Sequence, residues 1–319
     1  MPVTTLHKSP CLAAPTPLEI EQAALRAVAY ADVFGYPLQA TEIHRYLHGV
    51  AASLEATSAA LARCSIPGGS LSTWNGYYTL PGREGLVEVR RRRAALADQL
   101  WPAAVTYGHL IASFPFVRMV AVTGSLAWHN VDDEADIDYL IVTEPGRLWV
   151  SRRLIGALCR AARLDGVCLC ANYVLSTRAL LLADRTLYTA YELARMTPIA
   201  GFGMYRRLRR ANPWAATYLP NAAQPPRLPD GHPRPARTTS LRVMARLARL
   251  GERVLGSPLG AALEAWEMRY RIPRLLRQGV AQGEVSYGLD WYKAHTSGHR
   301  KRALAAFAER LRNLREATL

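Results

Sequence analysis

Two short sets of residues in this chain have the types and spacing that phosphate chemistry requires. Gly124 and Ser125 follow an apolar, β-branched run over residues 117–122, so they lie where a buried strand ends and the chain turns. Asp136 and Asp138 open a second apolar run. Side chains two apart on a strand share a face, so both carboxylates point the same way. Such a pair is costly alone but suits Mg²⁺, which binds one or two carboxylates with phosphate oxygens and water.

The Gly-Ser pair adds a second phosphate-binding feature. A glycine lets the backbone approach a ligand closely, and we expect a short helix over residues 126–129. Backbone amides at a helix start, with the Ser125 hydroxyl, can bind a phosphate. The alternative is a turn glycine beside two exposed acids. That alternative gives the carboxylate pair no packing purpose.

The order of these features resembles a known superfamily. A strand, Gly-Ser, roughly a dozen residues and Asp-x-Asp on a second strand are similar to the nucleotidyltransferases that include polymerase beta and the antibiotic nucleotidyltransferases. The resemblance covers about residues 115–200. More loosely, the whole chain resembles uncharacterised bacterial nucleotidyltransferases with an N-terminal winged-helix segment.

The resemblance implies a role for each of the four residues. Gly124 and Ser125 would bind the phosphates of an NTP such as ATP. Asp136 and Asp138 would be the catalytic residues that hold one or two Mg²⁺, with Mn²⁺ as an alternative. The metal would polarise the α-phosphate, activate an acceptor hydroxyl and neutralise the leaving pyrophosphate.

The third carboxylate of the superfamily pattern is missing. The strand expected to carry it, residues 167–175, contains no acid, and Cys168, Cys170 and Asn172 alternate on one of its faces. Asn172 or a thiol therefore lies where the third ligand or general base is expected. Three acids outside that strand are possible substitutes for the missing carboxylate: Asp165, Asp184 and Glu192. Three interpretations stay open: an enzyme with two carboxylates, an enzyme that recruits a distant acid, and a protein that binds nucleotide without turning it over.

Three arginines follow the Asp-x-Asp strand. We expect a helix from residue 147 to about residue 163, with Arg147, Arg152 and Arg153 near its start. Guanidinium groups match phosphate oxygens well, so we predict that these arginines bind the nucleotide. An exposed helix face is the alternative.

The net charge of +15 lies mostly in the last third of the chain. Residues 200–319 contain 22 Lys and Arg against 8 Asp and Glu. Such a basic region favours an anionic acceptor, which could be RNA or tRNA, a phosphorylated small molecule or a lipid head group. Among these we favour RNA.

Composition restricts the compartment. The apolar runs are far shorter than the roughly 18 residues of a membrane-spanning helix, and residues 1–17 predict a loose tail without a signal sequence. The five cysteines are odd in number and scattered, which indicates reduced thiols. We therefore predict a cytoplasmic protein with no membrane span.

Residues 18–82 predict three short helices and a hairpin, which together resemble a winged-helix module. Asn75 and Gly76 lie between two short apolar segments, a strong hairpin signal. The third helix offers only Arg63, opposed by Glu55, whereas DNA binding depends on a positive surface. We expect packing or partner docking rather than DNA binding by this module.

The remaining segments complete an α+β fold. Residues 83–112 predict a linking helix with a solvated Arg90–Arg93 face. Residues 113–218 predict the nucleotidyltransferase core, with a mixed sheet flanked by helices. A Pro-rich linker is expected over residues 219–237 and a basic helical region over residues 238–319. That region should hold helices over residues 240–255, 259–278 and 300–314, with Trp266 and Tyr270 as core rather than base-stacking residues. Residues 287–299 could fold over a substrate.

These features predict a Mg²⁺-dependent nucleotidyltransferase. It would move a nucleoside monophosphate from an NTP to the hydroxyl of an anionic acceptor. The alternative is a nucleotide-binding regulatory or scaffold protein whose catalytic core has decayed, a hypothesis motivated by the missing third acid. Intact Gly124-Ser125 and Asp136-x-Asp138 motifs favour the enzyme.

Overall fold

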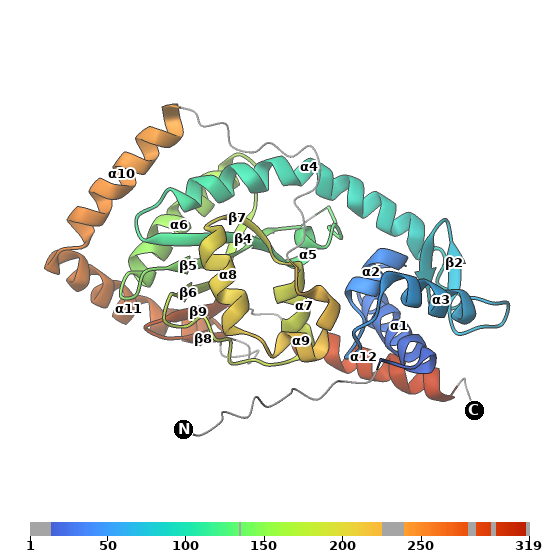
Figure 1. Ribbon diagram of the computed structural model, residues 1–319. Helices are drawn as coiled ribbons and strands as arrows, with labels where there is room; N and C mark the ends of the chain where they lie inside the picture. The colour runs from blue at the N-terminus through green and yellow to red at the C-terminus, as the bar shows by residue number, and fades with distance from the viewer. Residues whose placement is uncertain (1–13, 134, 225–238, 280–284, 295–297, 317–319) are drawn as a thin grey trace, which may run out of the picture.

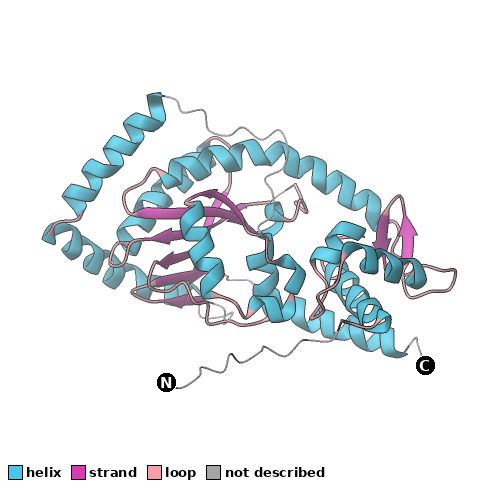
Figure 2. Cartoon of the chain, in the orientation of Figure 1, coloured by secondary structure: helices cyan, strands magenta, loops and turns pink. Residues whose placement is uncertain are grey.

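The computed structural model describes residues 14–133, 135–224, 239–279, 285–294 and 298–316. The fold is α+β, with helices flanking a six-stranded mixed sheet, as the sequence predicts (Figure 1, Figure 2). No helix in these ranges combines the length and the apolar character that crossing a membrane requires.

The N-terminal module begins with a capped helix. Thr16 accepts a hydrogen bond from the Glu19 N–H at 3.3 Å, and the Glu19 carboxylate accepts one from the Thr16 N–H at 2.7 Å. This reciprocal capping, with Pro17 at the first helical position, starts the helix inside the segment that we predicted to be a loose tail. Residues 1–13 of that tail lie outside the described residues. The module consists of α1 (Pro17–Asp32), β1 (Leu38–Gln39), α2 (Ala40–Arg45), α3 (Leu54–Cys64), β2 (Ser72–Trp74) and β3 (Tyr77–Thr79).

The predicted hairpin is confirmed. β2 and β3 pair antiparallel, and Asn75 and Gly76 between them have φ values of 51° and 80°. These left-handed conformations are the ones that a tight two-residue hairpin requires. β1, which the sequence did not reveal, adds two residue pairs on the other side of β3.

Helix α4 (Leu86–Ala112) runs from the N-terminal module across the large sheet (Figure 1). Its arginines correct the prediction of a uniformly solvated face. Arg90 donates to both oxygens of the Glu42 carboxylate at 2.7 and 2.9 Å and lies 4.0 Å from the centre of the Tyr36 ring. Arg93 donates to the Asn130 amide oxygen at 3.2 Å. Of the four arginines, only the middle two, Arg91 and Arg92, remain exposed.

The large sheet has the order β7-β4-β5-β6-β9-β8. β4 pairs antiparallel with both β5 and β7, and β5 pairs parallel with β6. The core elements are β4 (Val117–Thr123), α5 (Gly124–Ala127), β5 (Ile137–Thr143), α6 (Leu148–Leu164), β6 (Leu169–Ser176), α7 (Leu187–Arg195), β7 (Thr197–Ala200), α8 (Phe202–Ala211), α9 (Ala215–Tyr218) and a 3-10 turn (Pro220–Ala222).

The C-terminal region is not purely helical, which corrects the prediction for residues 238–319. Its three helices fall where expected, but two short strands between them extend the large sheet, with Lys293 opposite Tyr173. Aromatic and β-branched residues suit these strands, whose shortness hid them in the sequence. The region contains α10 (Thr239–Leu255), α11 (Pro258–Gly279), β8 (Val285–Tyr287), β9 (Trp291–Ala294) and α12 (His299–Glu316).

The N-terminal module and the core share one apolar cluster. Tyr30 of α1 stacks on Tyr191 of α7 with ring centres 4.1 Å apart, and Phe307 of α12 meets Tyr30 edge-on at 5.3 Å. Asp32 accepts hydrogen bonds from Arg83 at 2.9 Å and from Arg310 at 2.6 Å. Segments far apart in sequence therefore hold the module against the core.

Two further predictions need correction. The predicted Pro-rich linker begins as packed chain, because Leu219 is buried and the Asn221 amide donates to the His44 carbonyl at 2.8 Å; residues 225–237 lie outside the described residues. Trp266 and Tyr270, predicted as core, are 49% and 43% exposed. They lie on the side of α11 that faces away from the sheet.

Candidate functional site

A cavity of about 550 Å³ opens where β4 ends and where β5 and β6 begin. Gly124, Ser125, Asp136 and Asp138 all line it. The structure therefore brings together the four residues that the two sequence motifs predict. Phe34 of the N-terminal module and Arg93, Trp128, Asn130, Tyr188 and His299 complete much of the wall.

The strand register places the glycine against the second aspartate. Thr123, the last residue of β4, pairs with Asp138 of β5, so the next residue, Gly124, comes directly beside the carboxylate. Gly124 has a φ of +64°, and a Cβ built on it would lie 2.2 Å from the Asp138 Oδ2 atom. Both the backbone conformation and the close approach therefore require glycine at this position.

Asp138 has a mainly acidic and neutral environment. Its Oδ1 atom accepts a hydrogen bond from the Asn172 amide at 2.9 Å, and the Cys170 thiol donates to the Asn172 amide oxygen at 2.8 Å. Burial, followed by the charges of Glu192 and Asp136, raises the pKa of Asp138 to about 7, while the Asn172 hydrogen bond opposes that rise.

Among the possible replacements for the third acid, three line the cavity: Cys170, Asn172 and Glu192. Asp165 instead accepts a hydrogen bond from the Tyr107 hydroxyl at 3.3 Å, and Asp184 forms ion pairs with Lys293 and Arg300. Cys170 of β6 is in register with Asp138, and Asn172, two residues further along β6, reaches the Asp138 carboxylate through its side-chain amide.

Glu192 approaches the site from α7, outside the sheet. Burial raises its pKa, whereas the nearby Arg195 charge and a hydrogen bond from the Gly124 N–H lower it. Because Glu192 contacts the glycine turn and acts electrostatically on Asp138, it connects both motifs. Its distance in sequence from either motif gave no spacing signal.

The donor set suits a hard cation that keeps other ligands. Within the described ranges, no three His, Cys, Asp or Glu side chains form a group that could hold a metal ion. Asp136, the residue before β5, and Asp138, the second residue of that strand, both line the cavity. Mg²⁺ commonly uses one or two protein carboxylates with substrate phosphates and water. The residues therefore fit Mg²⁺ bound together with a nucleotide.

The comparisons with known proteins add no relative. No family model, curated protein or solved structure matches this chain. The resemblance to nucleotidyltransferases therefore depends only on the chain's own motifs and on the geometry of the cavity.

The three predicted arginines lie elsewhere, which corrects their assignment to the nucleotide. Arg147 is 5.5 Å from the Phe116 ring, beside the end of the sheet where Val117 pairs with Thr143. Five residues of β5, roughly 17 Å, separate Thr143 from Asp138. A helix that follows a strand starts at the strand's C-terminal end, whereas the Asp-x-Asp motif lies at the N-terminal end.

Arg152 and Arg153, both on α6, have protein side chains as partners. Arg152 bonds to the Tyr292 hydroxyl and lies 3.7 Å from the centre of its ring. Arg153 forms an ion pair with Glu267 at 2.9 Å. Neither lines the cavity, so the structure gives both a packing role.

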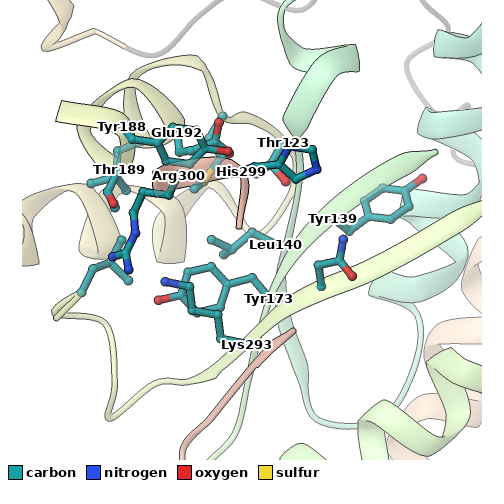
Figure 3. A pocket seen from close by; sticks show the side chains of 14 residues that line it. Thr123, Tyr139, Leu140, Tyr173, Tyr188, Thr189, Glu192, Lys293, His299 and Arg300 are labelled. Carbon is teal, nitrogen blue, oxygen red and sulfur yellow. The ribbon is translucent and has the colours of Figure 1, made fainter. Parts of the chain in front are cut away.

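Besides Arg93 of α4, which lines the main cavity, two cations near the site come from the C-terminal region. A smaller hollow of about 50 Å³ shares Thr123, Asn172 and Glu192 with the main cavity and is also lined by Lys293 and Arg300 (Figure 3). Figure 3 shows Glu192 and Tyr188 on one side of this hollow, with Tyr173 and Lys293 on another. His299 lines both spaces. The sequence signal was the Lys and His content of residues 287–299, of which 295–297 lie outside the described residues.

Proposed function

We propose that the chain is a Mg²⁺-dependent nucleotidyltransferase that moves a nucleoside monophosphate from an NTP to a hydroxyl acceptor. The observation that carries the proposal is the contact between Gly124 and Asp138 at the cavity wall. A turn glycine is held against one member of a carboxylate pair, in a cavity large enough for a nucleotide. Burying Asp138 close to Asp136 and Glu192 has a cost to folding that a binding role explains.

Each residue has a distinct role in the proposed reaction. Asp136 and Asp138 would hold the metal, which when bound neutralises charge on the α-phosphate and the leaving pyrophosphate. Asn172 fixes the orientation of the Asp138 carboxylate through its 2.9 Å hydrogen bond. Gly124 leaves room for a phosphate to approach the backbone, and the Ser125 hydroxyl can donate to a phosphate oxygen.

The acceptor is proposed to be anionic, with RNA favoured by the charge of residues 200–319. Lys293 and Arg300, which both pair with Asp184, line the hollow beside the main cavity together with His299. Acceptor binding should weaken steeply as salt rises, because released counterions contribute to the binding of a polyanion. A salt-independent Michaelis constant for the acceptor would contradict an anionic polymer.

The test is transfer of label from each α-phosphate-labelled NTP, with Mg²⁺ or Mn²⁺. The receiving pools are total tRNA, total small metabolites and the protein itself. We expect label in one pool, its loss in Asp136→Ala, and its retention in Asp165→Ala, an acid that does not line the cavity. Equal transfer by wild type and Asp136→Ala would overturn the assignment.

A second candidate is a nucleotide-binding regulatory protein with an inactive core. Asn172 favours it, because a neutral amide is bonded to Asp138 where a third carboxylate is expected. This candidate predicts metal-dependent NTP binding without pyrophosphate release, whichever acceptor is supplied. Transfer of label in the assay above would exclude it.

A further inference from the structure

The exposed apolar surface of this protein is concentrated on two helices. Of the 16 large apolar side chains that are exposed in the described residues, seven lie on α10 and α11. Monomeric soluble proteins rarely expose a contiguous apolar patch, so such a concentration indicates a contact surface. The seven are Leu247, Leu250, Val254, Leu259, Trp266, Tyr270 and Leu276.

On α10 the apolar stripe faces away from the body. The body-facing side is fixed by Glu252, which accepts from the Phe116 N–H and from Arg118, both at 2.8 Å. Leu247, Leu250 and Val254 follow at spacings of three and four residues on the far side, each 57% to 60% exposed. A surface helix normally turns such a stripe toward the core. Over its described residues, α10 instead presents its apolar stripe to the solvent.

Helix α11 repeats the pattern. Its Glu264 accepts hydrogen bonds from the Trp149 and Val150 amides at 2.9 and 2.8 Å, which fixes the inward side. Leu259 and Trp266, two turns apart on the opposite side, are 82% and 49% exposed. Figure 1 shows α10 and α11 at one edge of the molecule, away from the N-terminal module.

Arginines border both stripes. Arg246 and Arg253 on α10, with Arg269 and Arg277 on α11, are exposed beside the apolar side chains. On α11 the Trp266 and Tyr270 rings stack with centres 5.3 Å apart, and Arg274 lies 3.6 Å from the Tyr270 ring centre. Leucine and valine with interfacial Trp, Tyr and Arg are typical of helices that lie in the headgroup layer of a membrane.

We propose that α10 and α11 form a peripheral membrane element that binds an anionic lipid surface. A second copy of the chain fits less well, because two such faces would bring like charges together. A nucleic acid would use the arginines and rings but leave the leucines and valine of α10 uncovered. An anionic bilayer satisfies both the apolar stripes and the arginines. This proposal goes beyond the proposed nucleotidyltransferase function and does not depend on it.

The test is flotation of the full chain with phosphatidylcholine vesicles, with and without phosphatidylglycerol. We expect binding to the anionic vesicles that weakens with salt. The triple substitution Leu247→Ser, Leu250→Ser and Val254→Ser should weaken vesicle binding about tenfold or more, because the helix loses the apolar area that the membrane would bury. The matched control substitutes exposed leucines elsewhere, Leu18→Ser and Leu181→Ser, and should bind as wild type.

Three outcomes would overturn the proposal. The first is absence of binding to anionic vesicles. The second is equal binding by the triple variant and wild type, which would assign the attachment to net charge alone. The third is attachment to another partner in place of vesicles. A dimer in light scattering that the triple variant loses would identify a second copy. Binding of single-stranded RNA that Trp266→Ala loses, without vesicle binding, would identify a nucleic acid. Circular dichroism and thermal melting establish that each variant is folded.

Discussion

The two ends of strand β5 handle charge in opposite ways. At its C-terminal end, Arg118 pairs with Glu144 at 2.6 Å and with Glu252 at 2.8 Å. At its N-terminal end, Asp138 has the neutral Asn172 amide as a hydrogen-bond donor and lies near two further acids. One strand therefore carries a stabilising ion network at one end and an unfavourable acid cluster at the other. Acid clusters of this kind concentrate at functional sites.

The largest predicted effect separates these ends by activity. Asp138→Asn removes a metal-binding charge and should lower nucleotidyl transfer on the order of 10³-fold. Glu144→Gln, at the other end of β5, should leave transfer within about twofold, because its carboxylate pairs with Arg118 and does not line the cavity. Steady-state rates with the labelled NTP measure both, and comparable losses in the two variants would remove the functional distinction.

The glycine turn gives the next effect. Gly124→Ala forces a side chain into a left-handed conformation and against Asp138, whereas Gly146→Ala meets the same backbone cost at φ +67° with open space around it. The first should cost about 1–2 kcal/mol more in unfolding free energy than the second and should weaken NTP binding. Denaturant titration and binding measurements on both variants decide it; equal stability losses would mean that the Asp138 contact is unimportant.

The ends should also respond oppositely to pH. The pKa of Asp138 is raised from 3.8 to about 7, so the folded state holds a proton that the unfolded state loses. Its contribution is favourable below about pH 4 and declines on the order of 3 kcal/mol as pH rises to 7. Asp138→Asn should remove this part of the decline and leave the part due to Glu192, whose pKa is also raised. Urea unfolding of the metal-free protein from pH 4 to 8 measures the difference.

Glu252 provides the opposite slope. Burial opposes its ionisation, but hydrogen bonds from Arg118 and the Phe116 N–H outweigh burial and lower its pKa. Its stabilisation is therefore present above the unfolded pKa and is lost as pH falls through the lowered one. Persistence of the full pH 4 to 7 decline in Asp138→Asn would show that another group causes it.

The smallest effect concerns the ion network itself. Arg118→Gln should reduce unfolding free energy by about 1 kcal/mol, because its side chain is 31% exposed and solvent screens both pairs. Transfer should stay unchanged, since Arg118 is at the end of the sheet remote from the cavity. A loss of transfer beyond the stability effect would connect the two ends.

Local patterns predicted the elements that position the site. The apolar runs of β4 and β5 and the Gly124 turn could be inferred because each depends on neighbours in sequence. The same holds for the Asn75-Gly76 hairpin. The two aspartates share the cavity as expected, although Asp136 lies just before β5 rather than on it. The placement of Gly124 against Asp138 needed the strand register, which the sequence did not specify.

Non-local packing accounts for the errors. Arg147, Arg152 and Arg153 follow the aspartates closely in sequence, yet the length of β5 moves them to the far end of the sheet. Conversely, Glu192 and Lys293 reach the site from α7 and β9, whose position depends on long-range pairing such as that of Lys293 with Tyr173. Neither separation leaves a periodic signal in the sequence.

Calorimetric titration with a non-hydrolysable NTP analogue tests the central claim most directly, because it needs no acceptor. We expect the wild-type protein to bind the analogue in Mg²⁺ and to bind it little in excess chelator. Asp138→Asn should bind little of the analogue in either condition. Binding that is equally tight without a divalent cation, or that Asp138→Asn retains in full, would contradict a metal-nucleotide site at the start of β5.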